Sequence, residues 1–81
     1  ITYPNPFSTQ ATIQFTLKER TDVSINIYNA MGRLVRTVAT ETMDAGEKRY
    51  ALSGSNLAAG IYYCTLKAGN TTQTRSIIVS K

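Results

Sequence analysis

The residue types that most often carry catalysis are sparse in this chain of 81 residues. The sequence has no histidine, so the commonest general base and the commonest metal ligand are both missing. Serine and threonine are plentiful, but no serine stands in a Gly-x-Ser-x-Gly turn, and no imidazole is present to activate one. We therefore predict that the protein is not an enzyme.

Three acidic residues, Glu41, Asp44 and Glu47, stand close together in one predicted loop. Carboxylates can hold a calcium ion, but this spacing does not fit an EF-hand loop. Acidic loops are more often simply solvated, and calcium binding by this loop stays an open alternative. The glycines stand too far apart to form a phosphate-binding loop. The sequence thus predicts no cofactor and no metal site.

The single cysteine, Cys64, has no partner in the sequence for an internal disulfide or a structural zinc site. It alternates with Tyr62 and Leu66, which places the three side chains on one face of a predicted strand. We interpret Cys64 as a small core residue rather than a reactive thiol.

The net charge is +4, from nine basic and five acidic residues that form no basic run. Nucleic-acid binding needs a clustered basic stripe, so no nucleic-acid partner is expected. Weak attraction to an anionic surface remains compatible with this charge. No apolar run is long enough for a transmembrane segment. Tyr28, Tyr50 and Tyr63 fall on predicted outward faces, where they would either stack on sugar rings or shield the sandwich and contact a neighbouring domain.

The elements that would position these residues are short strands. Between Val23 and Ile27, apolar and polar residues alternate, which is typical of a half-buried strand. Asn29 to Gly32 supplies a turn, in which Asn29 tolerates left-handed backbone and Gly32 takes positive φ. Residues 33–38 return as the partner strand. Val35 and Val38 cannot lie on the same face of an unbroken strand, so a bulge is predicted near Arg36.

Similar patterns run along the rest of the chain. Two prolines end a first strand at Tyr3, and Phe7 is expected to plug one end of the fold. Further strands are predicted over residues 11–17, 47–52, 60–68 and 71–80, with a connection at 41–46 and one helical turn at 57–59. The fold class predicted is all-β, a seven-stranded immunoglobulin-like antiparallel β-sandwich. Its expected core comprises Ile13, Phe15, Leu17, Val23, Ile25, Ile27, Val35, Leu57, Tyr62, Cys64 and Leu66.

Four segments stand in a familiar order: YPNPF at 3–7, IYNAMGRLV at 27–35, LAAGIY at 57–62, and a terminal strand ending at Lys81. Together they resemble the type A C-terminal sorting domain of the type IX (Por) secretion system of Bacteroidetes. The Ig-like domain of the flagellar hook-capping protein and Ig-like tails of bacterial hydrolases share these patterns. The structural motif residues of the resemblance are Pro4, Asn5, Pro6, Phe7, Tyr28 and Gly32.

The resemblance implies a non-catalytic export signal with a covalently linked N-terminal cargo domain. It implies transit through the periplasm, recognition by the outer-membrane translocon, and cleavage by a sortase for release or attachment at the cell surface. Residues 1–81 would then be a single domain excised from a larger secreted protein. In the family, recognition is concentrated in the last strands. Here that maps onto Gly60, Ile61, Tyr62, Gly69, Asn70, Arg75, Ile77, Val79 and Lys81.

A local argument supports the same hairpin, because a two-residue turn at Gly69–Asn70 joins its strands. If the last strand lies at a sheet edge, it could add to the sheet of a partner. Arg75 and Lys81 would then supply charge, and Ile77 and Val79 would anchor the strand to its own core. The alternative function is an Ig-like structural or carbohydrate-binding accessory module of a secreted bacterial hydrolase.

Overall fold

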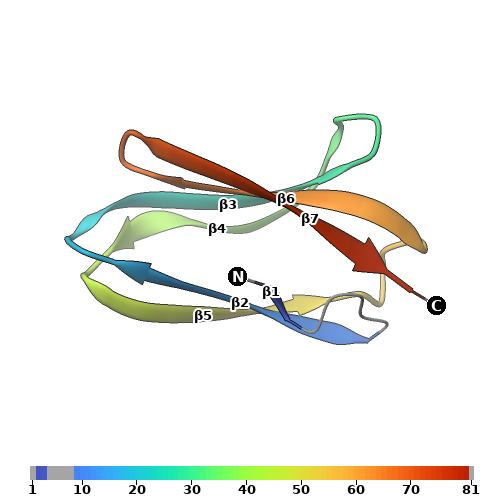
Figure 1. Ribbon diagram of the computed structural model, residues 1–81, viewed down its shortest axis with the longest axis horizontal. Helices are drawn as coiled ribbons and strands as arrows, with labels where there is room; N and C mark the ends of the chain where they lie inside the picture. The colour runs from blue at the N-terminus through green and yellow to red at the C-terminus, as the bar shows by residue number, and fades with distance from the viewer. Residues whose placement is uncertain (1, 4–8, 81) are drawn as a thin grey trace.

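The computed structural model describes residues 2–3 and 9–80 as an assembly of antiparallel β-strands (Figure 1). The strands are β1 (Thr2–Tyr3), β2 (Gln10–Leu17), β3 (Thr21–Asn29), β4 (Leu34–Met43), β5 (Gly46–Ser53), β6 (Gly60–Ala68) and β7 (Thr71–Val79). The predicted all-β class and antiparallel pairing are confirmed. The predicted count of seven strands is not confirmed, because only six strands have eight to ten residues and β1 has two.

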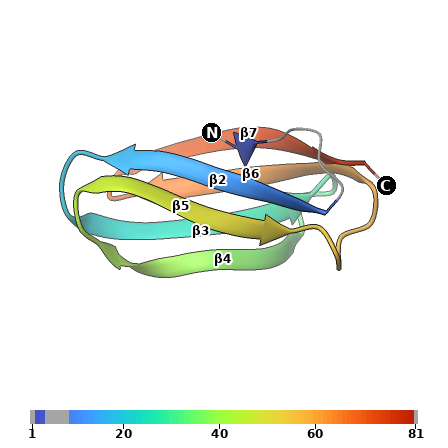
Figure 2. The same ribbon diagram turned by 90° about the horizontal axis from the view of Figure 1, so that it is seen from below.

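The strands form two sheets that face each other across one core. One sheet has the order β1-β2-β5 and the other the order β4-β3-β6-β7. Figure 2 shows β2 and β5 as one layer lying over the layer that contains β3 and β6. The molecule measures 37 × 22 × 16 Å, and its long axis follows the strands.

The core follows from the alternation in β3 and β6. Val23, Ile25 and Ile27 of β3 are buried, as are Tyr62 and Cys64 of β6. Burying one such aliphatic side chain contributes about 1.5–3 kcal/mol, so these two central strands anchor their sheet.

Part of the predicted core is placed differently. Phe15 and Leu66 are only partly buried, and Val35 is exposed at the bulged edge strand β4. Phe15 stacks on Tyr50 with ring centroids 6.2 Å apart, so Tyr50 lies on the inner face rather than the predicted outer one. Buried residues absent from the predicted core are Ala11, Met43 and Leu52, whereas Ile77 and Val79 anchor β7 in the core as predicted.

Strand β4 is longer and less regular than its partners. It continues to the buried Met43, so the predicted connection over residues 41–46 is wrong and only residues 44–45 link β4 to β5. Its pairing with β3 shifts twice, skipping Val38 and Val35 on either side of Arg36. The predicted bulge near Arg36 is confirmed. It lets both Val38 and Ala39 contact the core.

The turn between β3 and β4 depends on Asn29 in an unexpected way. Gly32 has φ of 82°, as predicted, but Asn29 does not enter the left-handed region. Its side-chain oxygen instead accepts hydrogen bonds from the backbone N–H groups of Met31 and Arg33, both at 3.0 Å. Asn29 therefore holds the turn through its side chain.

The connection before β6 contains no helical turn. Instead, the backbone N–H of Leu57 donates to the carbonyl of Gly54 at 3.1 Å in a tight turn. Leu57 is buried and caps the core as predicted. The predicted roles of Pro4, Asn5, Pro6 and Phe7 concern positions outside the described residues.

Candidate recognition site

The predicted recognition residues lie on the β6–β7 hairpin. Its two strands pair without a register shift from Gly60–Val79 to Ala68–Thr71. Strand β7 occupies an edge of the four-stranded sheet, as it must if it is to add to the sheet of a partner. The hairpin is thus one regular unit fixed to the rest of the sheet through β3.

Three of the nominated residues face the core and not the surface. Ile77 and Val79 are 0% and 1% exposed, and Tyr62 is 7% exposed. The Tyr62 hydroxyl donates a hydrogen bond of 2.7 Å to the carbonyl oxygen of Ala58. In the folded domain these three side chains anchor the hairpin and present almost no area to a partner.

The accessible nominated residues do not form one cluster. Gly60 and Ile61 begin β6, whereas Gly69 and Asn70 follow its far end. At about 3.4 Å per residue, the two groups are roughly 25 Å apart. Arg75 lies midway along β7 and is exposed, and Lys81 is outside the described residues. No single contact of small size covers both ends.

The Gly69–Asn70 turn is packed against the start of β3. Gly69 has φ of 58°, and its N–H donates to the carbonyl of Asp22 at 3.0 Å. A Cβ at this position would lie 2.9 Å from the Thr21 hydroxyl oxygen. Because φ is positive only at the first of the two turn residues, the geometry fits a type II′ hairpin turn.

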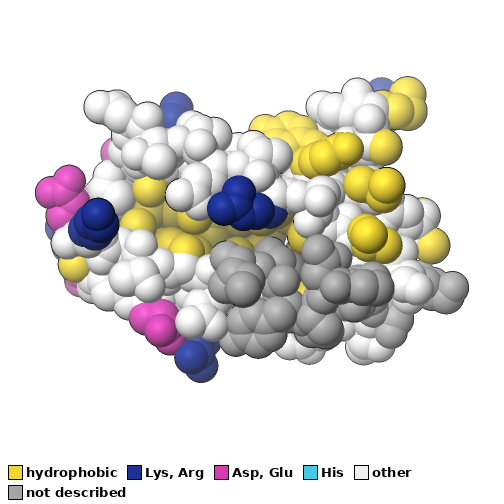
Figure 3. Space-filling model, viewed as in Figure 1, with side chains coloured by type: hydrophobic (Ala, Val, Ile, Leu, Met, Phe, Trp, Pro, Cys, Tyr) yellow, Lys and Arg dark blue, Asp and Glu magenta, His cyan; other side chains and the backbone are white. Residues whose placement is uncertain are grey.

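A set of apolar side chains gathers on the outer face of the four-stranded sheet, near the Gly60 end. Cross-strand partners share a face, and the pairs Leu34–Tyr28, Tyr28–Tyr63 and Ile61–Ile78 connect β4, β3, β6 and β7. We call Leu34, Tyr28, Tyr63, Ile61 and Ile78 the outer apolar patch. Figure 3 shows hydrophobic side chains gathered over the upper right of this view.

Sequence reasoning identified Tyr28 and Tyr63 as outward-facing but missed Leu34 and Ile78. Leu34 reaches the patch only because two register shifts bring it opposite Tyr28. Ile78 stands between two buried residues in an unbroken apolar run, so only its opposition to Ile61 shows its face. Val35 and Val38 cannot lie on the same face of an unbroken strand, and this was the one sequence signal that could have placed Leu34.

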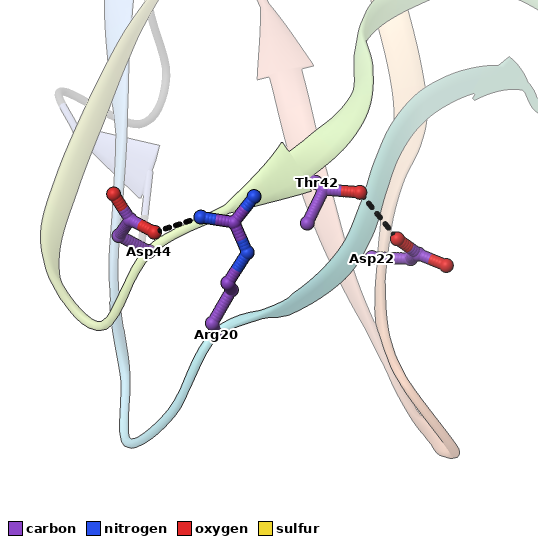
Figure 4. Close-up of polar contacts among 4 residues, drawn as sticks. All are labelled: Arg20, Asp22, Thr42 and Asp44. Atoms are coloured by element: carbon purple, nitrogen blue, oxygen red, sulfur yellow. Dashed lines mark hydrogen bonds and ion pairs between the residues drawn. The ribbon is translucent and has the colours of Figure 1, made fainter.

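The acidic residues lie at the opposite end of the sandwich, and four of the five, Asp22, Glu41, Asp44 and Glu47, have partners of their own. Arg20 donates to Asp44 at 2.5 Å, and Thr42 donates to Asp22 at 2.6 Å (Figure 4). Glu47 pairs with Arg49 at 2.9 Å, and Glu41 accepts from the Tyr50 hydroxyl at 3.2 Å. Among the described residues, no three acidic, cysteine or histidine side chains converge where a metal could bind.

Neither of two open hollows on the described part of the surface brings catalytic groups together. One, of about 860 Å³, opens between β2 and the β6–β7 hairpin over Phe15, Leu17 and Leu66. The other, of about 560 Å³, lies at the acidic end between Asp22 and Lys67. Burial raises the pKa of the Cys64 thiol, which keeps it protonated and unreactive at neutral pH. Burial beside Glu41 likewise raises the pKa of Tyr50.

The sequence of this sandwich was compared with known protein families. The model of the secretion system C-terminal sorting domain matches residues 2–80, almost the whole chain. The protein belongs to this family. The resemblance to type IX sorting domains is therefore confirmed, and with it the role of a C-terminal sorting signal. No curated protein matches the chain.

As a sorting domain, the protein belongs to a non-catalytic family whose members direct secretion out of the cell. Over residues 2–3 and 9–80 the structure contains no helix with the length and apolarity needed to cross a membrane. The recognition residues carried over from the resemblance remain predictions.

Proposed function

We propose that this domain is read by the outer-membrane translocon of a type IX system through its β6–β7 hairpin. The observation that carries the proposal is the family match over residues 2–80. The hairpin is regular, lies at a sheet edge and is fixed to the core by Ile77 and Val79. These anchors would keep Ile61, Arg75 and the Gly69–Asn70 turn in a fixed arrangement for a partner.

The proposal includes the path and the partners of the cargo. A covalently linked N-terminal cargo domain would cross the periplasm, pass the translocon and be released or attached to the cell surface by a sortase. The domain would then serve as a label, with no catalytic step of its own. Residues 1–81 would be a single domain excised from a larger secreted protein.

We also infer an immunoglobulin-like topology. The sheet orders β1-β2-β5 and β4-β3-β6-β7 correspond to strands A-B-E and C′-C-F-G of such sandwiches. In this arrangement the last two strands are sequence neighbours, pair with each other and end the sheet. That supports a hairpin that folds locally and is presented as one unit.

A fusion protein tests the proposal. Residues 1–81 are placed behind a signal peptide and a reporter in a host that uses type IX secretion, and the reporter is measured in the medium and on the cell surface. We expect secretion of the intact fusion and retention in the periplasm when residues 76–81 are deleted. Because this deletion also removes Ile77 and Val79, it tests the hairpin together with its anchors.

A charge reversal separates recognition from folding. Arg75 is exposed, and its guanidinium donates to the carbonyl of Thr74 across a long 3.5 Å contact, so Arg75→Glu should leave the fold intact. We expect it to lower secretion several-fold. The matched control is Lys18→Glu, in the exposed loop between β2 and β3. Equal secretion of both variants and the parent would argue against a role for Arg75.

One observation favours the accessory-module alternative. Tyr28 and Tyr63 lie directly opposite each other on the outer face, as an aromatic platform for a sugar would require. Retention of the purified domain on insoluble polysaccharides, lost in Tyr63→Ser, would support it. Secretion of the reporter fusion would support the sorting function instead.

A further inference from the structure

The outer apolar patch is more continuous than a chance scatter of exposed side chains. Leu34 is 50% exposed, Ile61 49%, Tyr63 39% and Ile78 42%. Neighbouring strands are about 4.8 Å apart, so a patch that spans four strands is about 14 Å wide. Clustered exposed apolar side chains on a sheet face mark interaction sites more often than single ones do.

The patch ends sharply. One row further along the same face, Thr37 donates to Asn26 at 2.9 Å, and Thr65 lies 3.5 Å from Thr74. These polar side chains bond to one another across neighbouring strands. The outer face therefore has an apolar half toward Gly60 and a polar half toward the acidic end.

Charge is divided along the same axis. All five acidic residues lie in the half of the sandwich far from Gly60, around the start of β3 and the end of β4: Glu19, Asp22, Glu41, Asp44 and Glu47. Five basic residues share that half and balance them: Lys18, Arg20, Lys48, Arg49 and Lys67. Of the other described basic residues, Arg33 lies in the turn next to Leu34. Arg36 and Arg75 lie opposite the buried Ile27 and Cys64, so their side chains leave the sheet on the other face. Arg33 is thus the described basic residue that borders the patch, and no acidic residue lies beside it.

We propose that the outer apolar patch is the surface that docks onto the secretion machinery, and that its partner is a protein with an apolar surface and a carboxylate placed to meet Arg33. The inference rests on the proposed function and names the contact within it. It differs from the hairpin predictions, since it joins β6 and β7 to Tyr28 of β3 and Leu34 of β4. Apolar contacts would supply affinity, and Arg33 would orient the encounter.

The chemistry of the patch favours a protein over other partners. Nucleic acid requires several basic side chains in line with the phosphates, and only Arg33 directly borders the patch in sequence. A sugar requires hydrogen-bonding groups around the stacked ring. Toward Gly60, the neighbours of Tyr63 and Tyr28 are Ile61 and Leu34, which offer none. In the next row on the other side, Asn26 and Thr65 are already bonded to Thr37 and Thr74. A patch of this width suits a transient contact, as a transported signal needs.

The test uses the reporter fusion in the type IX host. Ile61→Ser combined with Tyr63→Ser removes the centre of the patch, and we expect secretion to fall roughly ten-fold or more. The matched control combines Thr65→Ala with Lys67→Ala, on the same strand and the same face. We expect that control to be secreted like the parent. Circular dichroism and thermal melting of the purified domains verify that both variants fold.

A second pair of variants tests the contribution of positive charge. Arg33→Glu should lower secretion several-fold, whereas Lys67→Glu makes the same change of charge at the other end of the face and should not. Tyr63→Phe keeps the ring and should restore most of the secretion lost in Tyr63→Ser. Equal thermal melting of the two variants would show that the difference in secretion does not come from a weakened fold.

The outcomes separate the two proposals. If the intact fusion stays in the periplasm, the sorting proposal falls and the docking proposal falls with it. If the intact fusion is secreted and the folded patch variants are secreted equally well, sorting stands and the patch is not its contact surface. Patch-dependent retention of the purified domain on polysaccharides, with unchanged secretion of the variants, would also overturn the docking proposal.

Discussion

The four-stranded sheet has two edge strands, β4 and β7, which are built on different rules. Each forms a hairpin with a central strand, β3 or β6. Strand β4 shifts register twice and buries only Met43. Strand β7 pairs with β6 without a shift and buries Ile77 and Val79.

The difference shows how one sheet can protect one edge and keep another regular. Bulges twist an edge strand and discourage pairing with a foreign strand. The two shifts in β4 serve this purpose and also bring Leu34 into the outer apolar patch. The regular β7 instead holds its side chains at fixed positions on both faces, which suits a segment that is read by a partner.

The largest expected effect comes from the anchor of β7. Ile77→Ala leaves a cavity at a position that is 0% exposed, and we expect it to lower the free energy of unfolding by about 2–5 kcal/mol. The matched change in the other edge strand is Val38→Ala at a half-buried, bulged site, for which we expect about 1 kcal/mol. Urea denaturation measures both. Equal losses would mean that β7 is not the better-anchored edge.

The turn glycines give the next comparison. Gly69→Ala combines positive φ with a 2.9 Å approach to the Thr21 hydroxyl, and we expect a cost of about 1–3 kcal/mol. Gly32→Ala has positive φ but open space around the added Cβ, so we expect a smaller cost of about 1 kcal/mol.

Replacing Thr21 tests the reason for this difference. In a Thr21→Ala background, the cost of Gly69→Ala should fall to that of Gly32→Ala, because the nearby hydroxyl is gone. An unchanged cost would show that backbone strain alone sets the penalty at Gly69. Thermal and urea unfolding of the four variants supply the comparison.

The sequence predicted β3 and β6 because their alternation was unbroken, and it predicted the bulge because Val35 and Val38 could not share a face. It failed at the end of β4, where threonine and glutamate occupy an exposed edge and leave only Met43 as an apolar signal. In β7, where three apolar residues are consecutive, it assigned Ile77 and Val79 to the core, which is confirmed, but left the face of Ile78 open. Pairing with β6 decides that question, since Ile77 lies opposite the buried Tyr62 and Ile78 opposite the exposed Ile61.

The prediction of the recognition residues was limited in the same way, because the accessible face of each strand was not known. Family resemblance pointed to the hairpin but carried no information on which face is accessible. Tyr62, Ile77 and Val79 were therefore nominated for recognition although they are buried. The patch draws on four strands that are distant in sequence, so only their register could bring it together.

Asn29 gives a smaller contrast between the two turns. Asn29→Ala removes the acceptor for the Met31 and Arg33 N–H groups, and we expect a loss of about 1 kcal/mol. Asn70→Ala in the other hairpin should cost less, because Gly69 carries the positive φ there. Urea denaturation of the two variants would contradict this account if Asn70→Ala proved the more damaging.

The smallest effect concerns the polar row that borders the patch. Thr37 and Asn26 join β4 to β3 at 2.9 Å, whereas Thr65 and Thr74 join β6 to β7 at 3.5 Å. Cross-strand pairs of this kind contribute about 0.2–1 kcal/mol, and the shorter bond should lie near the upper end. A double-mutant cycle for each pair, with alanine substitutions and urea unfolding, measures the two coupling energies. A larger coupling energy for Asn26–Thr37 would mean that side-chain bonds compensate for the irregular backbone of the bulged edge. A larger coupling energy for Thr65–Thr74 would show that the regular pairing of β6 and β7 also holds its surface pairs more tightly.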